Sequence, residues 1–304
     1  MSAFDVSAGI SPRQPFESWA AFVAGLEAEG VGRVWVIDSQ LAMKDVYAGL
    51  VVAALETSRI GLGTGVTNAV TRHPTVTANA ISAVNEISRG RAILGLGAGD
   101  SALYGIGLQP QKVVEVEEAV AFFRSSIGEI PIYLAVSQQR MCELAGRVAD
   151  GAIVMGPAQP DMVRSQVEWI RSSRRDVEVC LIAPTSTEIE DVRSWASAQA
   201  RLLSHHRELP ASLALFGDEI KRSAETYDYT EHLSTHAGHQ AAVSDALVRA
   251  LGVVGTPDEC AARLTELREC GVDTFIFPIA GRNRIERWRR LRSAVLDRSR
   301  LRSD

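Results

Sequence analysis

The stretch RIGLGTGVTNAVTRHPTVTANAISAVNEISRGRAILGLGAGD, residues 59–100, decides the fold of this chain. It contains two runs, residues 59–65 and 91–97, in which bulky residues alternate with glycine, and each run opens into a glycine-rich loop. Between the runs, Pro74 marks the start of a helix, because proline at the first helical position loses no hydrogen bond. That helix has one apolar face, with residues spaced by three: Ala78, Ile81, Val84 and Ile87. The pattern predicts a strand–helix–strand unit whose two loops can hold a ligand.

The same alternation continues along the whole chain. Short, almost wholly apolar runs predict strands at 4–9, 33–37, 59–65, 91–96, 132–136, 151–155, 177–183 and 274–279. Helical patterns separate them at 16–29, 46–57, 75–88, 112–126, 140–148, 162–174, 189–203 and 259–269. Apolar strands joined by helices are typical of parallel α/β sheets covered on both faces. Their number and spacing indicate one domain, a (β/α)8 TIM barrel over residues 1–304, and a doubly wound open sheet is the alternative.

One long segment, residues 204–251, interrupts this order before the helix that precedes the eighth strand. It is more polar than its surroundings, and it contains every histidine except His73. Loops of this length in a compact domain are usually functional, and in a barrel this one leaves the carboxyl-end face, where active sites lie. We interpret it as an insertion that forms a lid or side wall of the active-site mouth. An excursion that serves structure or oligomer contacts is the alternative.

The composition is that of a globular enzyme. Of the 304 residues, 46% are hydrophobic and 23% are charged, which allows a large core. The net charge of -5 disfavours nucleic-acid binding, which needs a basic face. No apolar run approaches the ~18 residues of a membrane span, and residues 1–5 lack the features of a signal peptide. We therefore expect a cytoplasmic protein that acts on a small-molecule substrate, without membrane or nucleic-acid partners.

In a barrel, the residues that follow each strand converge on one mouth. Here they are mostly small or polar, with few ionisable groups: Ser7, Gly9, Asp38, Ser39, Gln40, Gly65, Val66, Thr67, Asn68, Gly97, Ala98, Gly99, Asp100, Ser137, Gln138, Gly156, Pro184, Thr185 and Pro278. No cluster of His, Cys and Asp suits a metal such as zinc, and no Gly-x-Ser-x-Gly motif suits a hydrolase. The mouth fits a flat, extended ligand held by backbone groups, and it predicts a cofactor that carries the reactive chemistry.

Several motifs along the chain support a family resemblance. They are GVTN at 65–68, TRHP at 71–74, SRGR at 88–91, GLGAGD at 95–100, PIYLAVS at 131–137, ADGA at 149–152, VGTP at 254–257 and CGVD at 270–273. In combination and in this order, the sequence resembles the luciferase-like flavin/deazaflavin oxidoreductase superfamily. Within it, the similarity is greatest to the F-420-dependent methylenetetrahydromethanopterin reductases and their actinobacterial relatives. The resemblance implies a luciferase-like (β/α)8 barrel that uses coenzyme F-420, or less often FMN.

The resemblance also implies a cofactor site. Residues 65–66 match the place where the family has a non-prolyl cis peptide, a bulge that supports the back of the deazaflavin ring. Residues 67–68 would contact the ring edge, and residues 97–99 would let the backbone approach the ribityl chain. Residues 135–138 match the region that holds the cofactor phosphate, at a helix N-terminus that favours anions. The expected cofactor residues are Gly65, Val66, Thr67, Asn68, Gly97, Ala98, Gly99, Ala135, Val136, Ser137 and Gln138.

Two departures from the family bear on the substrate. The methanopterin reductases have a glutamate in the first strand where this chain has Ser7, and many relatives have Asp-His after the second strand where this chain has Asp38-Ser39. The resemblance therefore implies the fold and the cofactor more strongly than the pterin substrate. We expect hydride transfer between C5 of the deazaflavin and an electrophilic C=C, C=N or C=O of a different small molecule.

A reduction needs a proton as well as a hydride, so a general acid near the ring is expected. Asp38, at the carboxyl end of a buried strand, is the predicted acid; its alternative role is to hold loop amides or the ring edge. The predicted substrate-pocket residues are Ser7, Ser39, Gln40, Tyr104 and Tyr227.

The sequence is compatible with two other functions. The same barrel could serve an FMN-dependent monooxygenase of the luciferase-like type, or a non-catalytic ligand-binding protein. We also expect a homodimer or a higher homo-oligomer.

Overall fold

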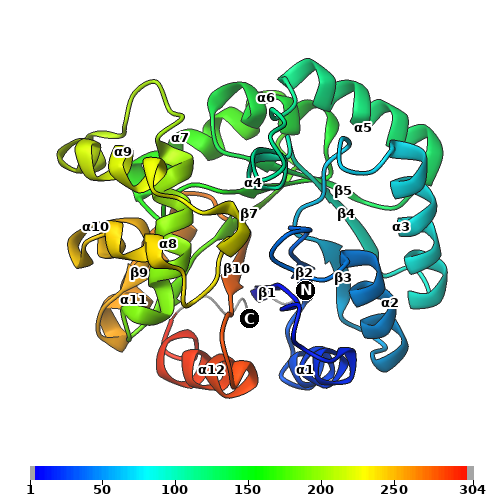
Figure 1. Ribbon diagram of the computed structural model, residues 1–304, viewed down its shortest axis with the longest axis horizontal. Helices are drawn as coiled ribbons and strands as arrows, with labels where there is room; N and C mark the ends of the chain where they lie inside the picture. Colours follow the sequence, from blue (N-terminus) through cyan, green and yellow to red (C-terminus); the bar gives the residue numbers. More distant parts are fainter. Residues whose placement is uncertain (1–3, 300–304) are drawn as a thin grey trace.

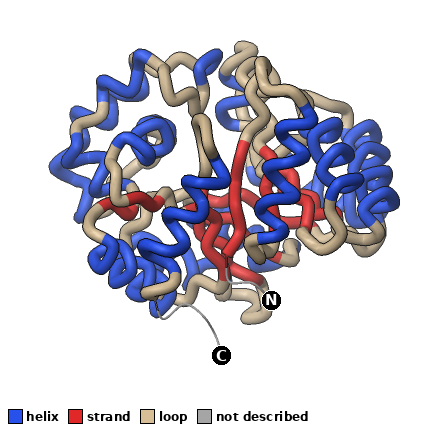
Figure 2. The backbone as a smooth tube through the Cα atoms, turned by 90° about the horizontal axis from the view of Figure 1, so that it is seen from below, coloured by secondary structure: helices blue, strands red, loops and turns tan. Residues whose placement is uncertain are grey.

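Eight parallel strands close into a barrel in the computed structural model, which describes residues 4–299 (Figures 1 and 2). In chain order the barrel strands are β1 (Phe4–Ala8), β2 (Arg33–Val36), β3 (Gly61–Thr64), β4 (Ala92–Leu96), β5 (Ile132–Val136), β6 (Gly151–Val154), β7 (Glu178–Ile182) and β10 (Thr274–Pro278). The first strand pairs with the last, with Val6 opposite Phe277. This pairing confirms the (β/α)8 barrel and excludes the open sheet.

Helices cover the outside of the barrel (Figure 2). They are α1 (Phe16–Ala28), α2 (Val46–Glu56), α3 (Pro74–Ser88), α5 (Val113–Ile127), α6 (Gln139–Val148), α7 (Pro160–Ile170), α11 (Pro257–Glu269) and α12 (Arg284–Leu291). α3 begins as the sequence predicts, with Pro74 in its first turn, and the ring of His73 accepts a hydrogen bond from the Thr75 amide at the helix N-terminus. No helix in the described part of the chain is long and apolar enough to cross a membrane.

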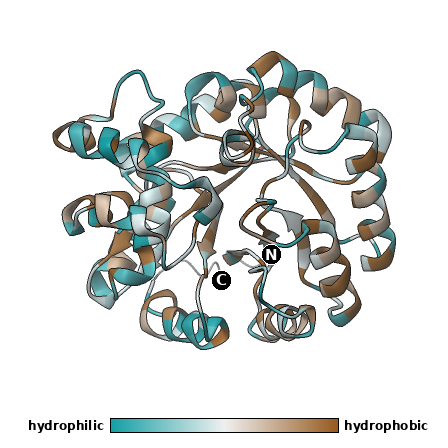
Figure 3. Cartoon of the chain, in the orientation of Figure 1, coloured by the Kyte–Doolittle hydropathy of each residue, from teal (hydrophilic) through white to brown (hydrophobic). Residues whose placement is uncertain are grey.

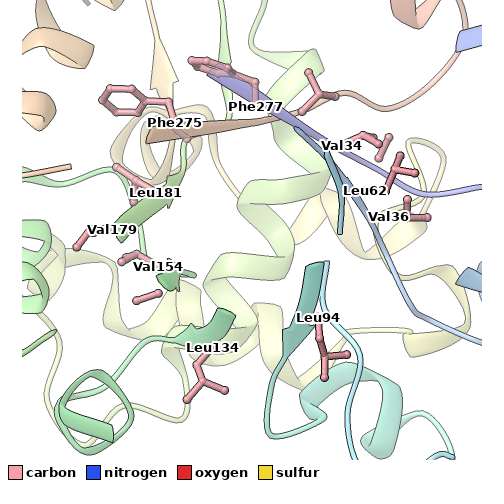
Figure 4. Packing of buried hydrophobic residues seen from close by; sticks show 14 of the residues in the cluster. Val34, Val36, Leu62, Leu94, Leu134, Val154, Val179, Leu181, Phe275 and Phe277 are labelled. Atoms are coloured by element: carbon pink, nitrogen blue, oxygen red, sulfur yellow. The ribbon is translucent and has the colours of Figure 1, made fainter. Parts of the chain in front are cut away.

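The main core lies between the strands and this layer of helices. Alternate strand residues point outward into it, for example Val34, Leu62, Leu134 and Phe275 (Figure 4). Figure 3 shows hydrophobic residues along the strands and hydrophilic ones on the outer turns of many helices. Burial of these apolar faces is the principal source of the barrel's stability.

The inside of the barrel contains a buried charged network. Arg33 on β2 donates to Asp5 on β1 (Nε–Oδ2, 2.6 Å) and to Glu178 on β7 (Nη2–Oε1, 2.5 Å). The hydroxyl of Tyr133 and the indole N–H of Trp35 donate to the same two carboxylates. One cation serves two carboxylates, so the charges are only partly compensated: Asp5 Oδ1 has no hydrogen-bond partner, and burial raises the pKa of Asp5 to about 6.

The alternation of glycine in the opening stretch has a packing reason. A Cβ on Gly63 would lie 2.5 Å from the ring of Trp35, and a Cβ on Gly95 would lie 2.0 Å from the backbone oxygen of Thr64. Gly63 therefore makes room for the side chain of Trp35, and Gly95 allows β4 to lie close against the backbone of β3.

After β7 the chain leaves the barrel, and we call residues 185–254 the excursion. It begins and ends with a two-stranded parallel sheet, β8 (Thr185–Ser186) and β9 (Val253–Val254). The segment between these strands contains α8 (Glu190–Leu203), η1 (Ala211–Phe216), α9 (Gly217–Glu225), η2 (Tyr229–Glu231), η3 (Gly238–Ala242) and α10 (Asp245–Leu251). It has an apolar core of its own, centred on Ala196, Leu213 and Leu247. A short helix that the sequence did not predict, α4 (Asp100–Tyr104), follows β4.

Candidate active site

A pocket of about 530 Å³ lies at the carboxyl ends of the barrel strands, where TIM-barrel active sites form. Its walls are formed by the loops after β2, β3, β4 and β5, by α8 of the excursion and by the turn that contains His232 and Leu233. Of the predicted site residues, those that line it are Asp38, Ser39, Gly65, Val66, Thr67, Asn68, Gly97, Ala98, Gly99, Ala135, Val136, Ser137 and Gln138.

The loop after β3 forms one side of the pocket. The peptide bond between Gly65 and Val66 is cis, as the family resemblance implied. Thr67 donates its amide to Gly95 and accepts the amide of Gly97, so this loop is tied to the loop after β4 by backbone hydrogen bonds. Asn68 is 1% exposed, and its Oδ1 accepts the amides of the next turn, which directs the chain toward α3.

Asp38 ties the loop after β2 to the same region. Its Oδ2 accepts hydrogen bonds from Thr67 Oγ1 at 2.7 Å and from Arg72 Nη1 at 2.6 Å, and its Oδ1 accepts from Arg72 Nη2 at 3.2 Å. Both carboxylate oxygens are engaged as acceptors, and the side chain is buried. This geometry does not favour Asp38 as the proton donor that the sequence suggested. It favours the alternative role, a residue that holds the loop.

The loop after β4 supplies a flat wall. A Cβ on Gly97 would lie 2.9 Å from Cγ2 of Val66, so a larger residue would enter the space beside the cis peptide. Gly99 adopts a φ of +90°, a conformation that favours glycine, and α4 begins directly after it. Asp100 in the first turn of α4 forms an ion pair with Arg201 of α8. This ion pair joins the barrel loop to the excursion.

The N-terminus of α6 forms the end of the pocket that the resemblance assigns to a phosphate. Ser137, Gln138 and Arg140 line the pocket there. Ser137 Oγ lies 2.8 Å from Nε2 of His206, and the Ser137 carbonyl accepts from the buried Gln166 amide. Burial lowers the pKa of His206 below its ordinary value. The free amides of a helix N-terminus and these polar side chains suit an anionic group.

The excursion contributes a side wall of the pocket, and most of the residues that form it were not predicted from the sequence. The pocket residues on α8 are Trp195, Ala198, Gln199, Arg201 and Leu202. The α8 segment was predicted only as a barrel helix, because its spacing says nothing about what it faces. His232 and Leu233, between η2 and η3, also line the pocket. The concentration of histidine in this segment was the signal that could have identified His232.

Four predicted substrate residues do not line the pocket. Ser7 is buried on β1 with no hydrogen-bond partner for its hydroxyl, and Gln40 donates to the Ala102 carbonyl instead. Tyr104 stacks on His205 with ring centroids 5.5 Å apart. Tyr227 does not line the pocket itself, but its hydroxyl lies 2.6 Å from Nδ1 of His232, which does. Among residues 4–299, no group of three or more His, Cys, Asp and Glu side chains could hold a metal ion.

A closed parallel barrel with a pocket at its carboxyl-end face is the architecture of TIM-barrel enzymes. A family model for luciferase-like monooxygenases matches residues 1–107 and 109–274. The chain is 30% identical to the 5,10-methylenetetrahydromethanopterin reductase of Methanolobus tindarius, over 87% of this chain and 91% of that protein. The chain belongs to the luciferase-like monooxygenase family, and it is an oxidoreductase.

Solved structures support the fold. The coenzyme F-420-dependent tetrahydromethanopterin reductase from Methanopyrus kandleri matches with a TM-score of 0.75 and 20% identity, over 97% of this chain and 99% of that one. The oxygenating constituent of 3,6-diketocamphane monooxygenase from Pseudomonas putida, solved in complex with FMN, matches with a TM-score of 0.63 and 14% identity, over 97% of this chain and 96% of that one. At these identities the similarity concerns the fold.

Proposed function

We propose that this protein uses coenzyme F-420 to transfer a hydride to or from a small organic substrate. The observation that carries the proposal is the pocket between residues 65–68 and residues 97–99, a cleft bounded by backbone and glycine. The similar protein from Methanolobus tindarius is a reductase, and the similar fold from Methanopyrus kandleri is that of an F-420-dependent enzyme. Both support the assignment.

The residues present fit a deazaflavin. Gly97 lines the pocket and packs against Val66, since a Cβ on it would lie 2.9 Å from Val66 Cγ2; a larger residue would push the Val66 side chain toward the proposed ring site. Gln199 is buried against the pocket and its Oε1 has no partner, so it offers an acceptor to a ring N–H or a ribityl hydroxyl. Ser137, Gln138 and the α6 N-terminus would hold the phosphate. When bound, the cofactor supplies a hydride at C5.

The protein's own side chains would bind and orient this cofactor. Asp38 and Arg72 fix Thr67 and thereby the loop that bears the cis peptide. The apolar residues Ile37, Met155 and Trp195 line the pocket and would pack against the ring and the substrate. The substrate would present an electrophilic C=C, C=N or C=O. Because Ser7 and Ser39 stand where the family resemblance implies acidic and histidine side chains, we infer a substrate other than methylenetetrahydromethanopterin.

Titration with both cofactors tests the proposal. Purified protein is mixed with oxidised F-420 and, separately, with FMN, and cofactor fluorescence is followed. We expect saturable quenching by F-420 at micromolar concentration or below and weaker retention of FMN. A Gly97→Val variant should lose F-420 binding while keeping its circular dichroism spectrum, because the valine side chain would displace Val66 beside the cis peptide. Wild-type protein that binds neither cofactor would refute the proposal and favour a non-catalytic ligand-binding barrel.

An FMN-dependent monooxygenase is the second candidate function. It is favoured by the name of the family model and by the similarity in fold to the FMN complex from Pseudomonas putida. Tight FMN retention without F-420 quenching, together with oxygen consumption by the reduced complex, would replace the first proposal by this one. A homodimer or higher homo-oligomer also stays a prediction, and sedimentation velocity measures it directly.

A further inference from the structure

The pocket contains one titratable side chain that is neither an ion-pair partner nor permanently charged. Among the described residues that line it, the titratable ones are Asp38, Asp100, Arg140, Arg201 and His232. Asp38 is paired with Arg72, and Asp100 is paired with Arg201. A guanidinium does not lose its proton in proteins. Of these titratable residues, His232 is therefore the one that can present a neutral N–H donor to a substrate.

Two hydrogen bonds fix the position of the His232 ring. Its Nδ1 lies 2.6 Å from the hydroxyl of Tyr227, and its Nε2 lies 3.3 Å from Oγ of Ser101, which also lines the pocket. The next residue, Leu233, packs in one apolar cluster with Ile37 and Val66. This cluster brings the excursion against the loop that carries the cis peptide.

The surroundings determine the protonation state of this ring. Burial, and after it the Arg201 cation, lower the pKa of His232 to about 3, against an opposing effect of Asp100; His239 acts in the same direction as Arg201. The imidazole is thus neutral at neutral pH. If the Tyr227 hydroxyl donates its proton to Nδ1, the ring proton is on Nε2, the nitrogen beside Ser101.

We propose that Nε2–H of His232 exchanges its 3.3 Å contact with Ser101 Oγ for a hydrogen bond to the oxygen of a carbonyl substrate, with Tyr227 as the positioning residue that sets the tautomer. The inference rests on the proposed function, and it selects C=O from the three electrophiles named there. A neutral donor suits a neutral carbonyl, and its hydrogen bond strengthens as charge develops on oxygen. When a hydride adds to the carbonyl carbon, the π pair moves to the oxygen, which takes its proton from water. No bond within His232 is made or broken.

The first test concerns the free protein and does not depend on turnover. Histidine labelled with nitrogen-15 is incorporated, and proton–nitrogen correlation spectra are recorded at neutral pH, with the His232 signals identified by their loss in H232Q. We expect a neutral ring with its proton on Nε2, and a mixture of both tautomers in Tyr227→Phe. An imidazolium, or a proton fixed on Nδ1, would overturn the proposal.

The second test uses reduced F-420 with cyclohexanone and acetophenone as probes. Removal of one oxyanion donor typically lowers kcat by about a hundredfold, and we expect this loss in His232→Leu, with the Kd for F-420 unchanged. H232Q retains an N–H donor and should recover part of the rate. His236→Leu, an exposed histidine of the same segment, serves as the matched control and should match wild type.

The outcomes separate this inference from the proposed function. Wild-type protein that fails to bind F-420 overturns both. Protein that binds F-420 but reduces neither ketone overturns the carbonyl assignment and leaves the cofactor assignment standing. A wild-type rate in His232→Leu overturns the role of His232 and leaves the cofactor assignment standing.

Discussion

Asp38 has the bonding pattern of a structural anchor. It receives three hydrogen bonds from Thr67 and Arg72, and so joins the loops after β2 and β3 beside the proposed ring site. An asparagine would keep the shape but would turn an amide toward one of these donors. The consequence should be a displaced loop, with the chemical step itself little affected.

We therefore expect Asp38→Asn to weaken F-420 binding by about tenfold, which is about 1.4 kcal/mol. The turnover number at saturating cofactor should stay within about threefold of wild type, because no proton is lost from the pocket. Asp45→Asn is a matched control: Asp45 also contacts Arg72, but it is exposed and caps α2, and asparagine caps equally well. A large loss of turnover with normal affinity in Asp38→Asn would restore Asp38 as the acid.

The glycines of β3 give a second prediction. Gly63→Ala places a Cβ 2.5 Å from the ring of Trp35, which is 1% exposed and donates to Asp5. Overpacking of this kind costs about 1–3 kcal/mol, and urea denaturation should report that loss. Gly238→Ala, where nothing lies within 4 Å of the new Cβ, should cost much less. Equal effects of the two substitutions would contradict the packing explanation.

Glu178 gives a pH-dependent prediction. Burial is the largest single effect and raises the pKa of Glu178, but the hydrogen bonds and charge of Arg33 and the hydrogen bonds from Tyr133 and Thr274 together outweigh it and lower the pKa from 4.5 to about 2. A carboxyl whose folded pKa lies below its unfolded pKa stabilises the protein above the unfolded value, and this stability is lost as the pH falls. The shift corresponds to about 3 kcal/mol, lost between pH 4.5 and pH 2.

Urea denaturation of wild type and Glu178→Gln at several pH values measures this contribution. The variant should be less stable by about 3 kcal/mol at neutral pH, and the difference should shrink toward pH 2. Asp5 acts in the opposite direction: burial raises its pKa from 3.8 to about 6, so its contribution to stability falls as the pH rises through that range. A constant difference between wild type and Glu178→Gln would exclude Glu178 as the source.

Some residues of the candidate site could be predicted from the sequence. Backbone features such as Gly65-Val66 and Gly97 could be assigned because they follow strands directly, and strand ends converge in a barrel. The roles of individual side chains could not be assigned in this way. Nothing in the order of residues indicates that Arg72, on the next loop, folds back onto Asp38. The same holds for Tyr227, which lies behind the pocket and reaches it through His232.

At the scale of elements, α8 is the part whose role the sequence conceals. Its buried Arg201 pairs with Asp100 of α4 and lies over the rings of Tyr227 and Tyr229, at 5.4 and 5.5 Å from their centroids. An amphipathic pattern predicts that a helix is buried on one face, and it does not say which element receives that face. Only the fold shows that α8 covers the pocket.

We expect Arg201→Gln to loosen α8 and the loops that follow it without unfolding the barrel. Arg201 is buried but the Asp100 side chain is 34% exposed, so removing the cation should cost less than the penalty of about 3–5 kcal/mol for a fully buried pair. Hydrogen exchange followed by mass spectrometry should show faster exchange in residues 190–251 and unchanged exchange in β2–β6. Arg207→Gln, an exposed arginine of the same segment, is the control. Uniformly faster exchange in Arg201→Gln would mean that the ion pair supports the whole barrel.

At the scale of the whole molecule, the regular βα order predicted the closed barrel, because eight apolar strands of similar spacing leave few other topologies. The excursion could not be placed in the same way. Its base is a pair of two-residue strands, β8 and β9, too short for a periodicity to be detected. Its contact with the pocket depends on tertiary packing around Leu233 and Trp195.

The proposed site joins both parts of the molecule, so ligand binding should stabilise them together. A ligand that binds only the folded state at a hundred times its Kd adds about 2.7 kcal/mol to the free energy of unfolding. F-420 should therefore raise the melting temperature, and removing it by dialysis should reverse the shift. Slower hydrogen exchange should appear both in the loops after β3–β5 and in α8. Protection confined to the barrel loops would place the excursion outside the cofactor site, and its role would then be limited to the substrate or to structure.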